Sequence, residues 1–344
     1  MTTLQNVDTP ALVRFMWTPV KKLWLTLQPS DWTIIGLLSL AVVVAAVRLP
    51  AVGPTLLALL FLQTGLLVGF LACTYVWTRW DIRLFAQYLR PAVIVTVIFT
   101  LYTSLGKLGA AAMPYSLDAP LAQIDRWLFG TDPSLFLQRY LTPGRVEFFG
   151  FIYGAFIPYI YLSMALGCLG RPAFERDQFL TGWVFTYAIS YLGYLFLPAR
   201  GPVVYHAADY EVSLAGGYFY QLVLRGVDAS GGLQGAFPSL HVGGSLYLCL
   251  FDLKTNRLRG LTYLPMVLLI YVSTLVLRYH YVIDLIVGTV IAVGCVPLGE
   301  RVFVTWARRR QAMGLPALPG GEADVVPHLP GAGAPDAAYL LPAD

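Results

Sequence analysis

Two histidines, an aspartate and an arginine lie in one stretch of the chain, and their spacing fits phosphate chemistry. His280 and Asp284 are four residues apart, so on a helix they share a face, one turn from each other. A carboxylate in that place accepts a hydrogen bond from one imidazole nitrogen, which fixes the tautomer and leaves the other nitrogen as a nucleophile. Arg278 precedes them at the mouth of this helix, where its planar fork can hold two phosphate oxygens.

The second part of the predicted site is Phe-Pro-Ser-Leu-His at residues 237–241. Pro238 is typical of the first turn of a helix, and Ser239 supplies a hydroxyl there. Gly235 and the glycines before it allow the backbone to turn its N–H groups toward an anion at this helix start. His241 lies in the first turn, where it can protonate a leaving oxygen. Residues 229–288 are therefore predicted to form one active site at a membrane surface.

These residues resemble a known family. Phe-Pro-Ser-Leu-His (237–241) and Arg-Tyr-His-Tyr-Val-Ile-Asp (278–284) are similar to the second and third signature motifs of the type-2 phosphatidic acid phosphatase superfamily. Within it, the chain most resembles the inositolphosphorylceramide synthase-like branch. The sequence of residues 124–133 also resembles that branch and reads Ile-Asp-Arg-Trp-Leu-Phe-Gly-Thr-Asp-Pro. The expected activity is thus transfer of a phosphate group of a lipid.

The resemblance implies a mechanism without a metal ion or cofactor. His280 attacks the phosphorus to give a phosphohistidine, and Asp284 orients it. His241 is the acid for the leaving group and then the base for the acceptor. The phosphate oxygens are held by Arg278, by Ser239 and by the backbone around Gly235.

The first motif of the superfamily is degenerate in this chain. The family has a lysine seven residues before an Arg-Pro pair, whereas here position 193 is Gly193 and Gly201 separates Arg200 from Pro202. Of the phosphate ligands in the first motif, Arg200 is expected to be retained. Lys107, in an earlier apolar segment, is a further candidate for a phosphate ligand. The missing lysine favours a transferase with a lipid hydroxyl as acceptor. A phosphatase for phosphatidate or polyprenyl pyrophosphate, with water as acceptor, is the alternative, and a lipid-binding or transport protein is a third.

The composition places the chain in a membrane. Hydrophobic residues make up 57% of it and charged residues 12%, about half the charged share of a soluble globular protein. No basic cluster with interleaved aromatic residues indicates nucleic acid. The four cysteines fall in apolar segments and are expected to be free core residues. The oligomeric state is left open.

The apolar segments predict an all-α bundle of about eight spans. They comprise residues 32–47, 53–77, 91–113, 148–169, 179–197, 238–253, 261–277 and 281–298. The predicted organisation is a cytoplasmic or interfacial lead-in (1–31), a membrane catalytic domain (32–299), and a basic segment with a disordered tail (300–344). Between the third and fourth spans, residues 118–141 are expected to form short helices on the membrane surface, as a lid or as a brace. Asp118 is expected to cap the first of them.

The distribution of positive charge predicts the orientation. With the N-terminus in the cytoplasm, most of the 23 lysines and arginines lie in inside segments, among them Arg308, Arg309 and Arg310. Both termini are then cytoplasmic, and His241 and His280 lie on the outer face, most simply of the plasma membrane.

Overall fold

The computed structural model describes residues 25–80, 88–230 and 232–319, and all regular secondary structure in these ranges is helical. The predicted all-α fold is confirmed. Predictions for the first part of the lead-in, for Gly231 and for the tail from residue 320 lie outside the described residues.

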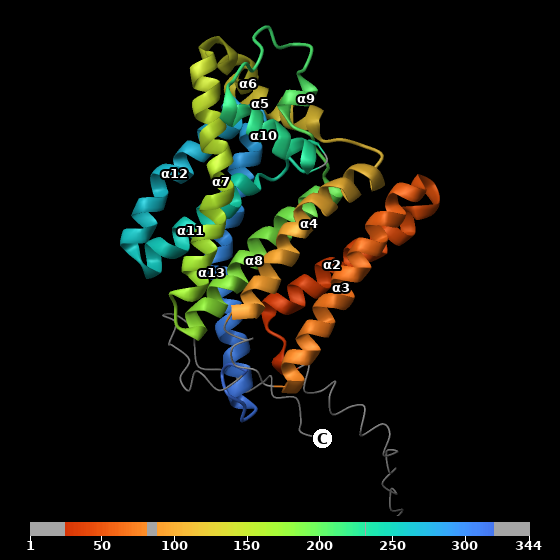
Figure 1. Cartoon of the computed structure of the whole chain (residues 1–344), viewed down its shortest axis with the longest axis vertical. Coiled ribbons are helices and arrows are strands. Elements are labelled where there is room, and N and C mark those ends of the chain that lie inside the picture. The colour runs from red at the N-terminus through yellow and green to blue at the C-terminus, as the bar shows by residue number, and fades with distance from the viewer. Residues whose placement is uncertain (1–24, 81–87, 231, 320–344) are drawn as a thin grey trace, which may run out of the picture.

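Long helices form the body of the molecule (Figure 1). In the described part they are α2 (Pro29–Val52), α3 (Pro54–Trp80), α4 (Arg90–Ala112), α7 (Pro143–Leu169), α8 (Ala173–Phe196), α11 (Leu240–Thr255), α12 (Arg257–Val276) and α13 (Val282–Ala312). Seven of these are long and apolar enough to cross a membrane, so the chain is an integral membrane protein. The exception is α11, predicted as a span, whose 16 residues extend about 24 Å.

Several helix ends differ from the apolar segments because polar residues can begin or end a helix. The α7 helix begins at Pro143, before the predicted Phe148, since the Thr142 hydroxyl accepts the Arg145 N–H and Pro143 suits the first turn. The α13 helix continues past the predicted Leu298 to Ala312, into the segment assigned to the basic tail.

The α8 helix is the centre of the bundle. It packs against α2, α4, α11 and α13, and its large aromatic side chains are fully buried. In Figure 1 the α2–α3 hairpin lies on one side of it and the α11–α12 hairpin on the other. Consequently α8 joins the accessory helices to the helices that carry the predicted motifs.

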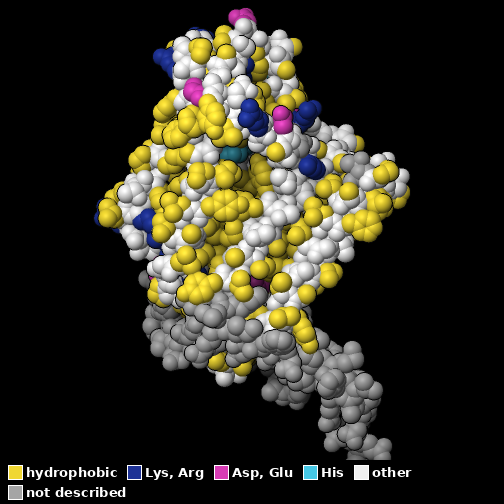
Figure 2. Space-filling view, in the orientation of Figure 1, with side chains coloured by type: hydrophobic (Ala, Val, Ile, Leu, Met, Phe, Trp, Pro, Cys, Tyr) yellow, Lys and Arg dark blue, Asp and Glu magenta, His cyan; other side chains and the backbone are white. Residues whose placement is uncertain are grey.

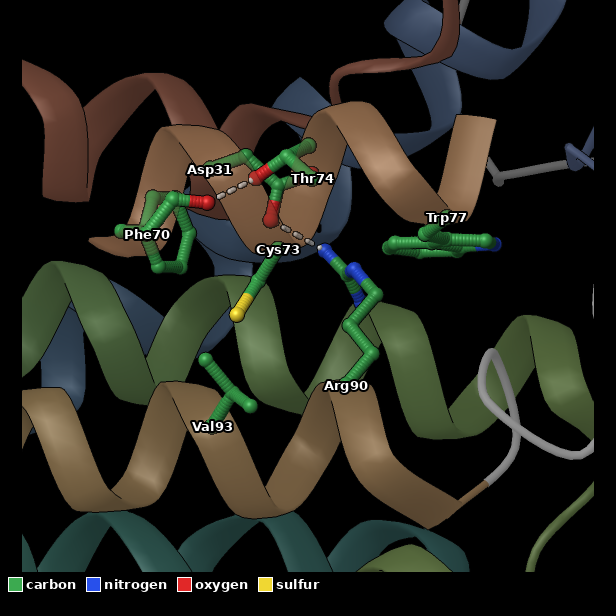
Figure 3. Close-up of a pocket in the computed structure, with 7 residues that line it drawn as sticks. All are labelled: Asp31, Phe70, Cys73, Thr74, Trp77, Arg90 and Val93. Carbon is green, nitrogen blue, oxygen red and sulfur yellow. Dashed lines mark hydrogen bonds and ion pairs between the residues drawn. The ribbon is translucent and has the colours of Figure 1, made fainter. Parts of the chain in front are cut away.

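A buried ionic cluster ties α2, α4 and α8 together at one end of the bundle. Arg90 donates to the Asp31 carboxylate at 2.9 Å, and its other amino group lies 3.6 Å from Asp177. Figure 3 shows Arg90 pointing to Asp31 in a small pocket that Trp77 and Cys73 also line. These charges compensate one another inside the apolar bundle, as buried charges must.

Short helices form a cap at the opposite end of the bundle (Figure 1). They are α5 (Asp118–Phe129), α6 (Pro133–Leu137), the 3₁₀ helix η2 (Gln138–Tyr140), α9 (Pro202–Tyr205) and α10 (Tyr218–Ala229). The predicted short helices between residues 118 and 141 are thus present. The prediction that Asp118 caps α5 is wrong. Its carboxylate instead accepts hydrogen bonds from backbone N–H groups of another loop.

Candidate active site

The predicted nucleophile and its aspartate are in contact. His280 Nδ1 lies 3.3 Å from Asp284 Oδ2, and both residues are buried. The prediction that they share a helical face is wrong in detail, because α13 begins only at Val282. Asp284 sits in the first turn and turns back to accept the N–H of Tyr281 at 2.9 Å, which brings its carboxylate to the ring of His280.

His241 lies on the far side of His280. Its Nδ1 is 3.3 Å from His280 Nε2, so the three side chains form a continuous relay from Asp284 to His241. The rings of Tyr153 and Phe156 on α7 pack against His241, each with a centroid distance of 4.5 Å. These contacts orient the imidazole in the first turn of α11.

Ser239 begins α11 and holds it against α13. The prediction that Pro238 lies in the first turn is wrong: Ser239 is the N-cap residue and its hydroxyl accepts the N–H of Val242, so Pro238 precedes the helix. The Ser239 N–H donates to the carbonyl of Asp284 at 3.2 Å. A Cβ at Gly288 would lie 2.5 Å from the Ser239 carbonyl, so only glycine permits this approach of the two motifs.

Arg278 points into the cap. Its guanidinium donates to the carbonyl of Val212 at 2.6 Å and stacks on the ring of Tyr210 at 3.6 Å from the centroid. Burial lowers the pKa of Arg278, and its Nε has no partner in the described part of the chain. Burial also raises the pKa of Tyr210 to about 12. The guanidinium is therefore held by a loop of the cap.

The remaining predicted phosphate ligands lie on three different segments. Arg200 has an exposed side chain, and its backbone N–H donates to Asp118. Gly235 has a φ of +75°, and a Cβ there would meet the ring of Tyr194 at 2.8 Å. Lys107 is half-buried on α4 and forms no ion pair with the described residues. None of the measured contacts joins these residues to His280 directly.

The structure explains why glycine occupies position 201, where it interrupts the first motif. Gly201 has a φ of +90°, and a Cβ there would lie 2.4 Å from the carbonyl of Tyr279. A side chain cannot occupy that position, so Gly201 allows the loop after Arg200 to pack on the segment that carries His280.

Sequence reasoning did not give functional roles to three residues that contact this site: Asp118, Asp125 and Tyr210. Two aspartates seven residues apart on one short helix, such as Asp118 and Asp125, share a face. Both are buried, at 6% and 1% exposure. That spacing was the available signal, whereas nothing local marks Tyr210 as the partner of Arg278.

The site is recessed. His280 is 4% exposed, His241 8% and Asp284 0%. Figure 2 shows a hollow that hydrophobic side chains surround, with a histidine side chain inside it and Lys and Arg side chains above it. Among the described residues, no group of three or more His, Cys, Asp or Glu side chains is arranged to hold a metal ion. An apolar approach to a polar site suits a lipid with a charged headgroup.

Comparisons with known proteins agree with this geometry. The chain matches the family model described as the PAP2 superfamily over residues 119–298, which include the cap and both motifs. It is similar to a PA-phosphatase related-family protein of Dictyostelium discoideum, at 31% identity over 126 residues. That match covers 36% of this chain and 23% of the relative, so the chain corresponds to about a quarter of the relative's length. No solved structure matches the chain.

Proposed function

This chain belongs to the PAP2 superfamily, and we propose that it is a lipid phosphotransferase that works through a phosphohistidine. The observation that carries the proposal is the buried relay of Asp284, His280 and His241 beneath the cap. The proposed donor is a lipid with a phosphate-linked headgroup, and the proposed acceptor is the hydroxyl of a second lipid.

The first proposed step is attack of His280 on the donor phosphorus. The Asp284 carboxylate faces Nδ1, so Nε2 carries the lone pair that attacks. The substrate phosphate takes the place of the contact between the two imidazoles. The Nε2–P bond forms, the P–O bond to the leaving group breaks, and His241 gives its proton to the leaving oxygen.

The second proposed step returns the enzyme to its starting state. His241 takes the proton of the acceptor hydroxyl, whose oxygen attacks the phosphohistidine while the Nε2–P bond breaks. Arg278, Arg200, the Ser239 hydroxyl and the backbone around Gly235 hold the phosphate oxygens in both steps. Lys107 is proposed as a further positive group for the donor headgroup.

The burial of the site supports a transferase over a phosphatase. A phosphohistidine exposed to water is hydrolysed unless the acceptor is better placed, so a transferase must exclude water. Here the histidines are almost fully buried under the cap. The resemblance of residues 124–133 to the inositolphosphorylceramide synthase-like branch supports the same choice.

The alternative proposal is a phosphatase of the same superfamily, with water as acceptor. The printed description of the Dictyostelium relative, a PA-phosphatase related-family protein, favours it. A lipid-binding or transport role is the weakest proposal, because the relay of two histidines and an aspartate is complete.

The proposed arrangement in the cell follows from the charges. Residues 32–299 form the catalytic membrane domain, with both termini in the cytoplasm and the cap on the outer face of the plasma membrane. Arg171, Lys254 and Arg259 lie near the end of the bundle opposite the cap, as the positive-inside rule requires of a cytoplasmic end.

The experiment that tests the function uses purified protein in vesicles with a phospholipid donor labelled in its headgroup phosphate. Ceramide or diacylglycerol is supplied as acceptor, and the control is His280→Ala in the same vesicles. We expect label to move to the acceptor lipid, with water-soluble label as the minor product. If only water-soluble label forms with either acceptor, the phosphatase proposal replaces the transferase. If the His280→Ala protein is as active as the wild type, the phosphohistidine mechanism is wrong.

A further inference from the structure

Helix α5 reaches the start of the catalytic helix with two buried carboxylates. Asp125 Oδ2 accepts the N–H of Val282 at 2.7 Å, and Asp125 Oδ1 accepts the N–H of Ile283 at 3.0 Å. These are the first two N–H groups of α13, which have no partner within their own helix. The N-cap residue of α13 is Tyr281, a residue type that seldom caps a helix. Asp125 therefore supplies the cap from a distant part of the sequence.

Asp118, on the same face of α5, holds the segment that precedes α13. Its Oδ1 accepts the Tyr281 hydroxyl at 3.0 Å and the N–H of Gly201 at 2.8 Å. Its Oδ2 accepts the N–H of Arg200 at 3.0 Å. One carboxylate thus joins the remnant of the first motif to the third motif, beside His280.

Apolar contacts fix α5 in the same position. Leu121 and Ala122 are buried in a cluster with Ala199, Ala236 and Tyr281. The opposite face of α5 is exposed, and Trp127 there is 82% accessible. The hydrogen bonds and apolar contacts of its inner face are those of a fixed brace, which is the second of the two roles expected from the sequence, and a moving lid would have to break them.

We propose that Asp125 and Asp118 are positioning residues, which hold the segment from Arg278 to Asp284 so that His280 Nε2 is aimed at the donor phosphorus. This inference rests on the proposed function, because it assigns a role toward His280 as nucleophile. Burial raises the pKa of the Asp125 carboxyl, and the N–H groups of Val282 and Ile283 offset this rise only in part. The helix dipole favours the negative form of a carboxylate at a helix N-terminus.

If one carboxylate oxygen of Asp125 is replaced by an amide nitrogen, His280 is expected to lose its alignment with the donor phosphorus. In Asp125→Asn, the side-chain oxygen can accept from Val282 or from Ile283, while the NH₂ group faces the other donor. The start of α13 then shifts, and a misplacement of about 1 Å costs about 10²-fold in rate. Asp125 contacts only backbone groups of α13 and none of the proposed phosphate ligands, so binding is expected to change little in Asp125→Asn.

The test measures total donor turnover, transfer plus hydrolysis, in vesicles for Asp125→Asn and Asp118→Asn, with exposed Gln123→Ala on α5 as the matched control. We expect kcat to fall about 10- to 100-fold in both variants, with KM of Asp125→Asn within about twofold of the wild type. Trapping of the phosphohistidine in a single turnover should slow by the same factor. Hydrogen exchange should become faster at Val282 and Ile283 in Asp125→Asn, but not in Gln123→Ala.

Tyr281→Phe provides a second variant in case an aspartate variant fails to fold, since it removes only the hydroxyl that Asp118 accepts. It should lower kcat with KM unchanged. Wild-type kcat in folded Asp125→Asn, Asp118→Asn or Tyr281→Phe protein overturns the positioning role while leaving the proposed function intact. Absence of both turnover and phosphoenzyme in the wild-type protein overturns the proposed function itself, and this inference with it.

Discussion

Replacing Asp284 with asparagine tests whether its carboxylate activates His280. In the wild type, Asp284 Oδ2 is 3.3 Å from His280 Nδ1 and accepts the Tyr281 N–H at 2.9 Å. The asparagine oxygen can still accept the Tyr281 N–H, so the first turn of α13 keeps its cap. What is lost is the negative charge behind the imidazole, which becomes cationic as Nε2 bonds to phosphorus.

The expected magnitude follows from burial. Asp284 is 0% exposed, and its second oxygen has no partner among the described residues, so little solvent screens its charge from His280. Removing one partner of a buried charged pair costs about 3–5 kcal/mol. At about 1.4 kcal/mol for each factor of ten, kcat falls about 10²- to 10⁴-fold. The upper limit is the loss seen for aspartate-to-asparagine changes in Ser-His-Asp triads, about 10⁴.

The assay is single-turnover formation of the acid-labile phosphohistidine, normalised to folded protein. Asp252→Asn is the matched control, because Asp252 is also buried and pairs with Arg171 and Arg259 at the other end of the bundle. We expect Asp252→Asn to lower the thermal midpoint but to keep the rate per folded molecule. A rate for Asp284→Asn within twofold of the wild type refutes the reasoning, as does an equal loss in both variants.

Three further predictions concern the ligand, the metal and the orientation. Arg278→Lys should lower kcat/KM about 10- to 100-fold, because lysine cannot make the bidentate contact or stack on Tyr210. An unchanged kcat/KM would show that Arg278 is not a phosphate ligand. Turnover should be unchanged in excess chelator and inhibited by vanadate, and restoration by a divalent ion after chelation would contradict this. In a cysteine-free background, Asp228→Cys should react with an impermeant thiol reagent outside intact cells, and Asn256→Cys should not. The reverse labelling pattern would show that the protein has the opposite orientation in the membrane.

The sequence alone predicted the membrane helices and the candidate reacting groups. Apolar segments of about 20 residues predict membrane helices because a bilayer must be crossed without unpaired backbone groups. His280 and Asp284 are close in sequence, so their contact follows from local geometry. Their pairing with His241 did not follow from local geometry, since a long apolar hairpin separates the two motifs. The chemistry of the residue types and the resemblance to a family indicated it.

Tertiary packing decided how those groups are held. The bond from Asp125 to the start of α13 joins residues 157 positions apart, and the partner of Arg278 is a carbonyl in a loop. Any buried N–H or carbonyl is an equally suitable partner, so the identity of the partner depends on how the helices pack. The same reason explains the errors over Pro238 and Asp118. Whether a residue caps its own helix or binds elsewhere depends on which unpaired groups the rest of the fold brings to it.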